Sequence, residues 1–146
     1  MNKTISTPND SSRSAGLNAN AKPTILIVDD DRRFARALED SFSLANINTL
    51  VAHDGDAGLA IALCRKPDLM LLDTRMPRRS GYLVLEYLAT QEDLSILTVL
   101  MSENEGQRHE TYGRMLGAVD FLQKPLNSNE VAAMVAGLLE SNPAKK

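Results

Sequence analysis

Short apolar runs alternate with longer segments of helical character from residue 24 almost to the end of the chain. The runs lie at residues 24–28, 48–52, 68–72, 97–101 and 119–123. Their apolar residues mostly follow one another directly, which is typical of strands that are covered on both faces in a parallel sheet. Five buried parallel strands are therefore predicted.

The segments between these runs carry apolar residues at the spacing of a helix. Phe34, Leu38 and Phe42 recur every four residues after the first run, which places them on one helical face. The later apolar positions are Ala57, Ile61 and Cys64, then Leu83, Leu85 and Leu88, and finally Val131, Val135, Leu138 and Leu139. Asn127 and Glu130 precede the last set as a pair typical of a helix start.

The segment from residue 104 to residue 117 is the weakest helix, because Gly106 and Gly113 lie within it. Each interval between strands still has room for one helix. The pattern predicts an α/β fold in which a doubly wound, five-stranded parallel sheet has helices on both faces.

Composition narrows the class of protein. The chain is 43% hydrophobic and lacks Trp, so its core must be aliphatic, and its formal net charge of −3 gives no reason to expect nucleic-acid or membrane binding. Residues 1–23 are polar without a period and are expected to form a disordered leader before a domain at 24–140 and a short tail at 141–146. The single cysteine, Cys64, is expected to be a small buried hydrophobe, and its solitary state is typical of the cytoplasm.

Polar residues whose side chains could take part in binding or catalysis follow the predicted strands. Asp29, Asp30 and Asp31 come after the first run, and Asp73 comes directly after the third. The fourth and fifth runs are followed by Ser102 and by Lys124 with Pro125, whereas His53 and Asp54 after the second belong to a loop and a helix start. Because parallel strands bring their carboxyl ends to one edge of the sheet, these groups are expected to meet there.

Several carboxylates at one edge repel one another unless a cation lies between them, and oxygen ligands of this kind suit Mg²⁺. Asp30 and Asp73 are the predicted ligands, whereas Asp31 is expected to cap the first helix. A lysine can neutralise one carboxylate, and a hydroxyl can donate a hydrogen bond to an added oxygen. The set predicts a phosphoryl-acceptor site with Asp73 as the nucleophile.

Four motifs carry a resemblance to a known family. They are "ILIVDDD", "DTRMPRRSG", "LMSE" and "DFLQKP", in this order along the chain. With them, residues 24–140 resemble the receiver domain of two-component response regulators. The resemblance implies a flavodoxin-like strand order of 2-1-3-4-5 and a signalling domain that catalyses only its own phosphoryl transfer and dephosphorylation.

The resemblance also implies a role for individual residues. Asp73 corresponds to the phosphoacceptor. The metal ligands correspond to Asp30, which would bind directly, Asp29, which would bind through water, Asp73, and the backbone carbonyl of Arg75.

Lys124 corresponds to the lysine that stabilises the phosphoryl group, and its peptide bond to Pro125 is expected to be cis. The switch residues correspond to Ser102 and Phe121, and the positions that tune reaction rates are Arg75, Glu103 and Asn104. Glu103 stands where the family commonly has a small residue.

Partners follow from the same resemblance. The phosphoryl donor is expected to be a histidine kinase or a histidine phosphotransfer protein. No output domain is recognisable after residue 139, so a stand-alone receiver in the cytoplasm is expected to act on a downstream protein through residues 105–139, with self-association left open. Arg78 and Arg79 belong either to a solvated loop or to a partner contact.

Other functions remain to be weighed against this one. A pseudo-receiver would bind a partner without phosphorylation, and the chain could instead be a fragment of a longer regulator. A phosphohydrolase of the haloacid-dehalogenase type would need an acid where Arg75 stands. Flavin binding would need a phosphate loop after the first strand, where the sequence has only acids and arginines.

Overall fold

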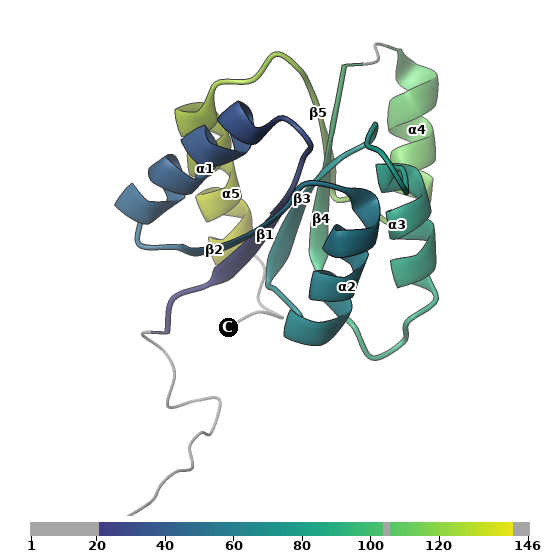
Figure 1. The fold of residues 1–146 in the computed structure, drawn as a ribbon, viewed down its shortest axis with the longest axis horizontal. Coiled ribbons are helices and arrows are strands. Elements are labelled where there is room, and N and C mark those ends of the chain that lie inside the picture. Colours follow the sequence, from purple (N-terminus) through teal and green to yellow (C-terminus); the bar gives the residue numbers. More distant parts are fainter. Residues whose placement is uncertain (1–20, 104–105, 142–146) are drawn as a thin grey trace, which may run out of the picture.

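The computed structural model describes residues 21–103 and 106–141, and within them five strands alternate with five helices (Figure 1). The strands are β1 (Thr24–Val28), β2 (Asn48–Ala52), β3 (Leu69–Asp73), β4 (Leu97–Ser102) and β5 (Asp120–Gln123). The helices are α1 (Arg32–Leu44), α2 (Gly55–Arg65), α3 (Gly81–Ala89), α4 (Gln107–Met115) and α5 (Ser128–Glu140). The predicted runs match β1 and β2 in both bounds, and β3 lies one residue later than predicted.

All neighbouring strands pair in parallel, in the order β2-β1-β3-β4-β5. Helices α1 and α5 cover one face of the sheet, and α2, α3 and α4 cover the other (Figure 1). The predicted fold class and strand order are confirmed. The connection from β2 to β3 crosses over β1, which leaves β1 and β3 as neighbours at the centre of the sheet.

The central strands are buried on both faces. Ile25 and Ile27 of β1 pack with α1 and α5, whereas Leu26 and Val28 pack toward α2 and α3, and all four side chains are fully buried. Full burial of one such aliphatic side chain stabilises the fold by roughly 1.5–3 kcal/mol. The same alternation in β3 and β4 gives the sheet two aliphatic cores, one on each side.

The two outer strands do not follow the prediction of burial on both faces. In β2 only Ala52 is buried, and β5 has no fully buried residue. Each of these strands has a neighbour on one side only, so fewer helices reach over it. Two-sided burial therefore holds for β1, β3 and β4.

Helix α2 turns a different face to the sheet than the sequence predicted. Gly55, Gly58, Leu59 and Ala62 are buried, whereas the predicted core residue Cys64 is exposed. Gly58 lies so close to Val28 that a Cβ atom there would stand 2.6 Å from a Val28 methyl group. Because two glycines permit this close approach, the buried stripe is displaced and the prediction of a buried Cys64 is wrong.

A similar displacement occurs in α3. Val84 is fully buried, whereas Leu83, a predicted core position, is 49% exposed. Leu85 and Leu88 are buried as predicted. The error again arises because neighbouring positions are apolar, and the packing against the sheet decides which of them faces inward.

Four of the five helices begin at a side chain that caps them. Asp31, Asp54, Ser80 and Asn127 each accept a hydrogen bond from a backbone amide in the first turn, as predicted for Asp31 and Asn127. Helix α4 instead begins after Gly106, which offers no side-chain hydrogen bond. Among the residues described, no helix combines the length and apolar character needed to cross a membrane.

Candidate functional site

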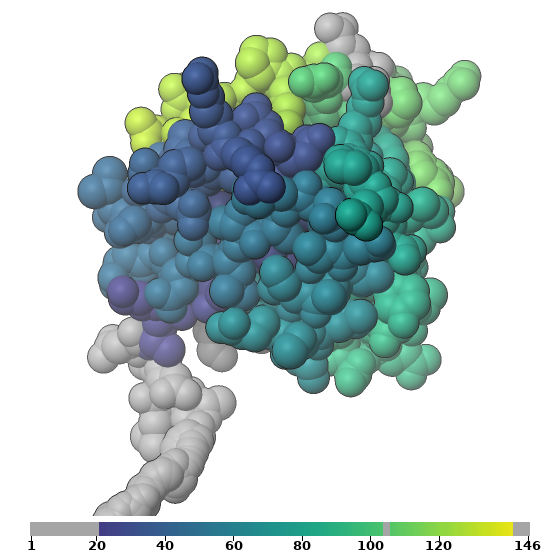
Figure 2. Space-filling model, viewed as in Figure 1, coloured from purple at the N-terminus to yellow at the C-terminus, as the bar shows by residue number. Residues whose placement is uncertain are grey.

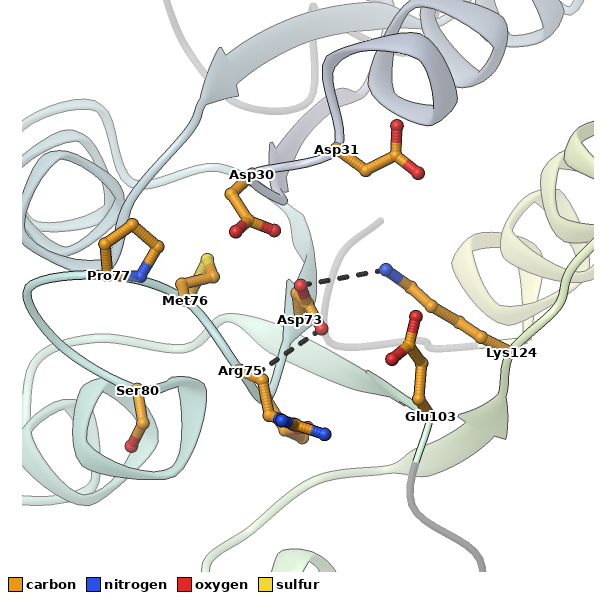
Figure 3. A pocket seen from close by; sticks show the side chains of 10 residues that line it. Asp30, Asp31, Asp73, Arg75, Met76, Pro77, Ser80, Glu103 and Lys124 are labelled. Carbon is orange, nitrogen blue, oxygen red and sulfur yellow. Dashed lines mark hydrogen bonds and ion pairs between the residues drawn. The ribbon is translucent and has the colours of Figure 1, made fainter.

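The carboxyl ends of the strands open onto a cleft of about 640 Å³ (Figure 3). Strand β1 leads into Asp30 and Asp31, β3 ends on Asp73, and β5 leads into Lys124. The lining residues are Asp30, Asp31, Asp73, Thr74, Arg75, Met76, Pro77, Ser80, Glu103 and Lys124. The strand-end groups predicted to converge are therefore brought to one edge of the sheet.

Asp29 lies beneath this cleft and is fully buried. One of its carboxylate oxygens accepts a hydrogen bond from the backbone amide of Asp31 at 2.9 Å, and the other accepts one from Nζ of Lys124 at 2.8 Å. The ring nitrogen Nδ1 of His53 lies 3.0 Å from the Asp29 carbonyl oxygen. Both oxygens of the Asp29 carboxylate are thus held by the chain itself.

Asp73 is the last residue of β3 and is 5% exposed. Its carboxylate lies 3.7 Å from Nζ of Lys124 and accepts a 3.4 Å hydrogen bond from the Arg75 amide. Burial, followed by the charge of Asp29, raises the pKa of Asp73 to about 7, although Lys124 opposes the shift. The side chain therefore sits in a place where one further positive charge would favour its ionised form.

Lys124 joins the two buried carboxylates. Its side chain is only 13% exposed, and its Nζ also lies 5.6 Å from the centre of the Phe34 ring. Burial acts to lower the pKa of Lys124, but the hydrogen bond and charge of Asp29, with the charge of Asp73, outweigh it and leave the pKa above its ordinary value. Lys124 remains an ammonium at neutral pH. Its peptide bond to Pro125 is cis, as the family resemblance implies.

Three carboxylates are close enough to share a cation. Oxygens of Asp29, Asp30 and Asp73 all lie within 4.8 Å of one another, and Asp30 is exposed to the cleft. Only one of the three is directly hydrogen-bonded to Lys124, so the group carries excess negative charge. Hard oxygen ligands with uncompensated charge fit Mg²⁺, which binds through one or two carboxylates and retains water.

The loop after β3 is fastened to the start of α2. Arg79 contacts Asp56 at 2.9 Å, and Arg78 lies 3.7 Å from Asp54. Gly55 touches the backbone of Arg79, where no side chain would fit. These contacts were not predicted from the sequence. The one sequence feature that could have indicated them is Gly55, the glycine at the start of the helix. The side chains of Arg78 and Arg79 therefore form ion pairs within the domain and are not simply solvated.

The remaining predicted residues lie around the cleft. Ser102 ends β4 and is fully buried, and its carbonyl accepts a 2.7 Å hydrogen bond from the Lys124 amide. Phe121 on β5 is half-buried beneath α4. Glu103 lines the cleft and also a second cavity of about 380 Å³ beside it, which Phe34 and Leu126 help to form. Asn104 lies outside the described residues.

Fold and site together define a flavodoxin-like α/β domain with an acidic centre at the carboxyl ends of its strands. Residues 25–136 match the family model described as the response regulator receiver domain. The chain therefore belongs to the response regulator receiver domain family of two-component signalling. Members of this family are signalling domains rather than classical enzymes.

Individual relatives agree with this assignment. The transcriptional regulatory protein CpxR of Klebsiella pneumoniae is 36% identical over 115 residues, which are 79% of this chain and 48% of the relative. The DNA-binding dual master transcriptional regulator RpaA of Synechocystis is 35% identical over 118 residues, which are 80% of this chain and 49% of that protein. The chain thus spans about half the length of the curated relatives it matches.

Solved structures show the same relationship. The receiver domain of the Francisella response regulator 1452 superposes with a TM-score of 0.76 at 27% identity, covering 82% of this chain and 98% of the other. The signal receiver domain of the response regulator NarL from Mycobacterium tuberculosis gives the same TM-score and identity, covering 83% and 98%. The likeness extends over nearly all of these receiver domains.

Proposed function

We propose that Asp73 accepts a phosphoryl group from a histidine kinase or a histidine phosphotransfer protein, and that this modification switches a partner-binding surface. The observation that carries the proposal is the position of the Asp73 carboxylate, which faces the cleft between the Lys124 ammonium and the Asp30 carboxylate (Figure 3). A carboxylate in such a place has both an approach for a donor and charged groups to stabilise the reaction.

In the proposed reaction a carboxylate oxygen of Asp73 attacks phosphorus, and the bond from phosphorus to the donor's leaving atom breaks. The electron pair of that bond departs with the leaving group. A Mg²⁺ ion held by Asp30, Asp73, the Arg75 carbonyl and, through water, Asp29 would neutralise charge on the transferring group. The two hydrogen bonds already made by the Asp29 carboxylate support its indirect role.

Lys124 has two tasks in this proposal. Before transfer, its ammonium neutralises Asp29 through the 2.8 Å hydrogen bond and leaves Asp73 at 3.7 Å as the weaker partner. During transfer, the same ammonium stabilises the negative charge on the phosphoryl oxygens. Since it contacts both carboxylates, it can move between them without leaving the site.

The switch is proposed to run from Ser102 to Phe121 and then to α4. The Ser102 hydroxyl would donate a hydrogen bond to the added phosphoryl oxygens, and the Phe121 ring would follow it inward. A Cβ atom on Gly113 would lie 3.5 Å from the Phe121 ring, so α4 rests on this side chain. Movement of Phe121 would change the surface that we propose for the downstream partner, at residues 105–139.

Several broader predictions remain part of the proposal. They are a stand-alone role, a cytoplasmic location, a protein as the downstream partner and no contact of this domain with nucleic acid. The names of CpxR and RpaA describe transcriptional regulators, so a DNA-linked output is the alternative for the pathway. A histidine kinase as donor agrees with membership in the family.

The decisive experiment is intact-mass analysis after incubation with phosphoramidate and Mg²⁺. The wild type should gain the mass of one phosphoryl group, and Asp73→Asn should gain none. Asp40→Asn is the matched control, because Asp40 is a largely exposed acid on α1. Equal labelling of Asp73→Asn and wild type would place the phosphoryl group elsewhere, and no labelling of the wild type would favour the phosphorylation-independent pseudo-receiver.

A further inference from the structure

Glu103 is a charged residue at the cleft that the proposed transfer step does not use. It follows directly after β4, is exposed, and lines both the main cleft and the neighbouring cavity. Figure 3 shows its carboxylate directed toward the space between Asp73 and Lys124. Within the described part of the chain, no ion pair or hydrogen bond engages this side chain. Glu103 therefore presents an unneutralised negative charge to an incoming molecule.

The charges around the cleft are unequal even without Asp29. The carboxylates of Asp30, Asp31, Asp73 and Glu103 line it, against the two cationic side chains of Arg75 and Lys124. A bound Mg²⁺ ion would offset the acids nearest to it, but Glu103 lies on β4's side of the cleft, away from Asp30 (Figure 3). Glu103 adds a further negative charge at that side of the cleft, beside Asp73, so its removal should make the electrostatic potential there less negative.

We propose that Glu103 selects the phosphoryl donor by charge. It disfavours acyl phosphates, which enter as dianions, relative to N-phosphorylated donors, whose leaving nitrogen carries a proton and lowers the net negative charge by one. The repulsion between Glu103 and a donor scales with the donor's charge, so it discriminates between the two classes. This inference rests on the proposed function, because it concerns the donor for Asp73.

The two reactions differ only in their leaving groups. With phosphoramidate, an Asp73 oxygen bonds to phosphorus, the P–N bond breaks, and its electron pair departs on nitrogen as ammonia, which keeps the protons it already carried. With acetyl phosphate, the P–O bond breaks and acetate leaves with the pair. Both give the same aspartyl phosphate, so a difference in rate between them reports on the approach and departure of the donor.

The test measures initial rates of phosphorylation by intact mass with each donor, at a Mg²⁺ concentration that saturates every variant. Glu103→Gln keeps the size of the side chain and removes its charge. It should raise the rate with acetyl phosphate about fivefold and the rate with phosphoramidate less than about twofold, and high salt should shrink the difference. Glu92→Gln is the matched control, since exposed Glu92 precedes β4 at the opposite edge of the sheet.

Each other outcome has a definite meaning. An equal rise with both donors would show that Glu103 acts by size or shape, and no change with either would show that its charge is not felt; both results overturn the inference. Wild-type protein that neither donor labels would contradict the proposed function itself. A change in the donor ratio for Glu92→Gln would assign the effect to overall net charge instead of Glu103.

Discussion

At the scale of single residues, the site has more buried carboxylates than cations to neutralise them. Asp29 and Asp73 are both buried, and Lys124 is the one cation in contact with them among the described residues. Lys124 donates a hydrogen bond of 2.8 Å to Asp29 but lies 3.7 Å from the Asp73 carboxylate, so the charge of Asp73 is the less compensated of the two. A buried carboxylate with a raised pKa beside an open cleft is typical of a functional site, which agrees with the role proposed for Asp73.

The raised pKa makes Asp73 a source of instability at neutral pH. In the unfolded chain its carboxyl ionises near 3.8, whereas in the folded protein it does so near 7. The folded state therefore holds the proton more tightly, and its free energy of unfolding falls as pH rises between these values. In the absence of divalent ions, Asp73→Asn should be more stable than wild type at about pH 8, by roughly 1–3 kcal/mol, with little difference at about pH 4.

Urea denaturation in EDTA at the two pH values measures this difference. Addition of Mg²⁺ should reduce the advantage of the variant at neutral pH. A gain in stability that is the same at both pH values would show that Asp73 does not titrate between them.

Lys124→Met should destabilise the protein because it leaves Asp29 buried without its cation. Removal of one member of a buried pair costs about 3–5 kcal/mol, and we expect a loss near the lower end, since Mg²⁺ and water can reach this edge of the sheet. Arg36→Met is the control, because the Arg36–Asp40 pair is exposed and should contribute less than about 1 kcal/mol. Similar losses in both variants, measured by chemical denaturation, would contradict the buried role of Lys124.

At the scale of elements, α4 is held differently from the other helices. It lacks a capping side chain, and Gly113 is its only buried residue. A Cβ atom on Gly113 would crowd a Leu100 methyl group at 2.5 Å and would lie in ordinary contact with the Phe121 ring at 3.5 Å. The absence of a side chain at this position therefore brings α4 close to the proposed switch residue.

Two glycine substitutions separate this contact from helix propensity. Gly137 of α5 has open space around it, so Gly137→Ala should stabilise the protein by about 0.5–1 kcal/mol through propensity alone. A Cβ atom on Gly113 would lie 2.5 Å from a Leu100 methyl group, so Gly113→Ala should instead destabilise by roughly 1–3 kcal/mol through overpacking. Thermal and urea unfolding of both variants provide the measurement. Stabilisation by both changes would show that α4 does not rest on Leu100 and Phe121.

At the scale of the whole molecule, the sheet separates two cores and gathers its polar groups at one edge. In the space-filling view, the segment from α1 to α2 covers most of the face that is turned to the viewer (Figure 2). The two cores meet through β1 and β3, whose carboxyl ends carry the acidic cluster. A ligand that joins those ends is therefore linked to the stability of the entire domain.

Binding of Mg²⁺ should accordingly stabilise the folded domain. At a concentration tenfold above its dissociation constant, the ion should raise the free energy of unfolding by about 1.4 kcal/mol. Asp30→Asn should lose most of this increment while it folds normally, because Asp30 is exposed. Calorimetric unfolding with and without EDTA checks the expectation, and an undiminished Mg²⁺ effect in Asp30→Asn would remove Asp30 from the site.

Most of the architecture was predictable because short-range patterns of apolar, polar and capping residues determine it. Consecutive apolar residues specify β1 and β3, a capping aspartate precedes α1, and polar residues follow the strands. Parallel strands must bring those polar residues to a common edge, so the proximity of Asp30, Asp73 and Lys124 followed from topology. The particular strand order came from resemblance to a family, since the runs themselves do not state which strands are neighbours.

The amino-acid sequence by itself thus determined the type and succession of the elements and the chemistry available at one edge of the sheet. The tertiary structure alone decided that Cys64 is exposed, that Val84 is buried in place of Leu83, and that Asp29 takes the closer contact with Lys124. The physical reason is the range in sequence over which the interactions act. Backbone conformation responds to nearby residues, whereas burial and charge pairing depend on atoms that only the folded chain brings together.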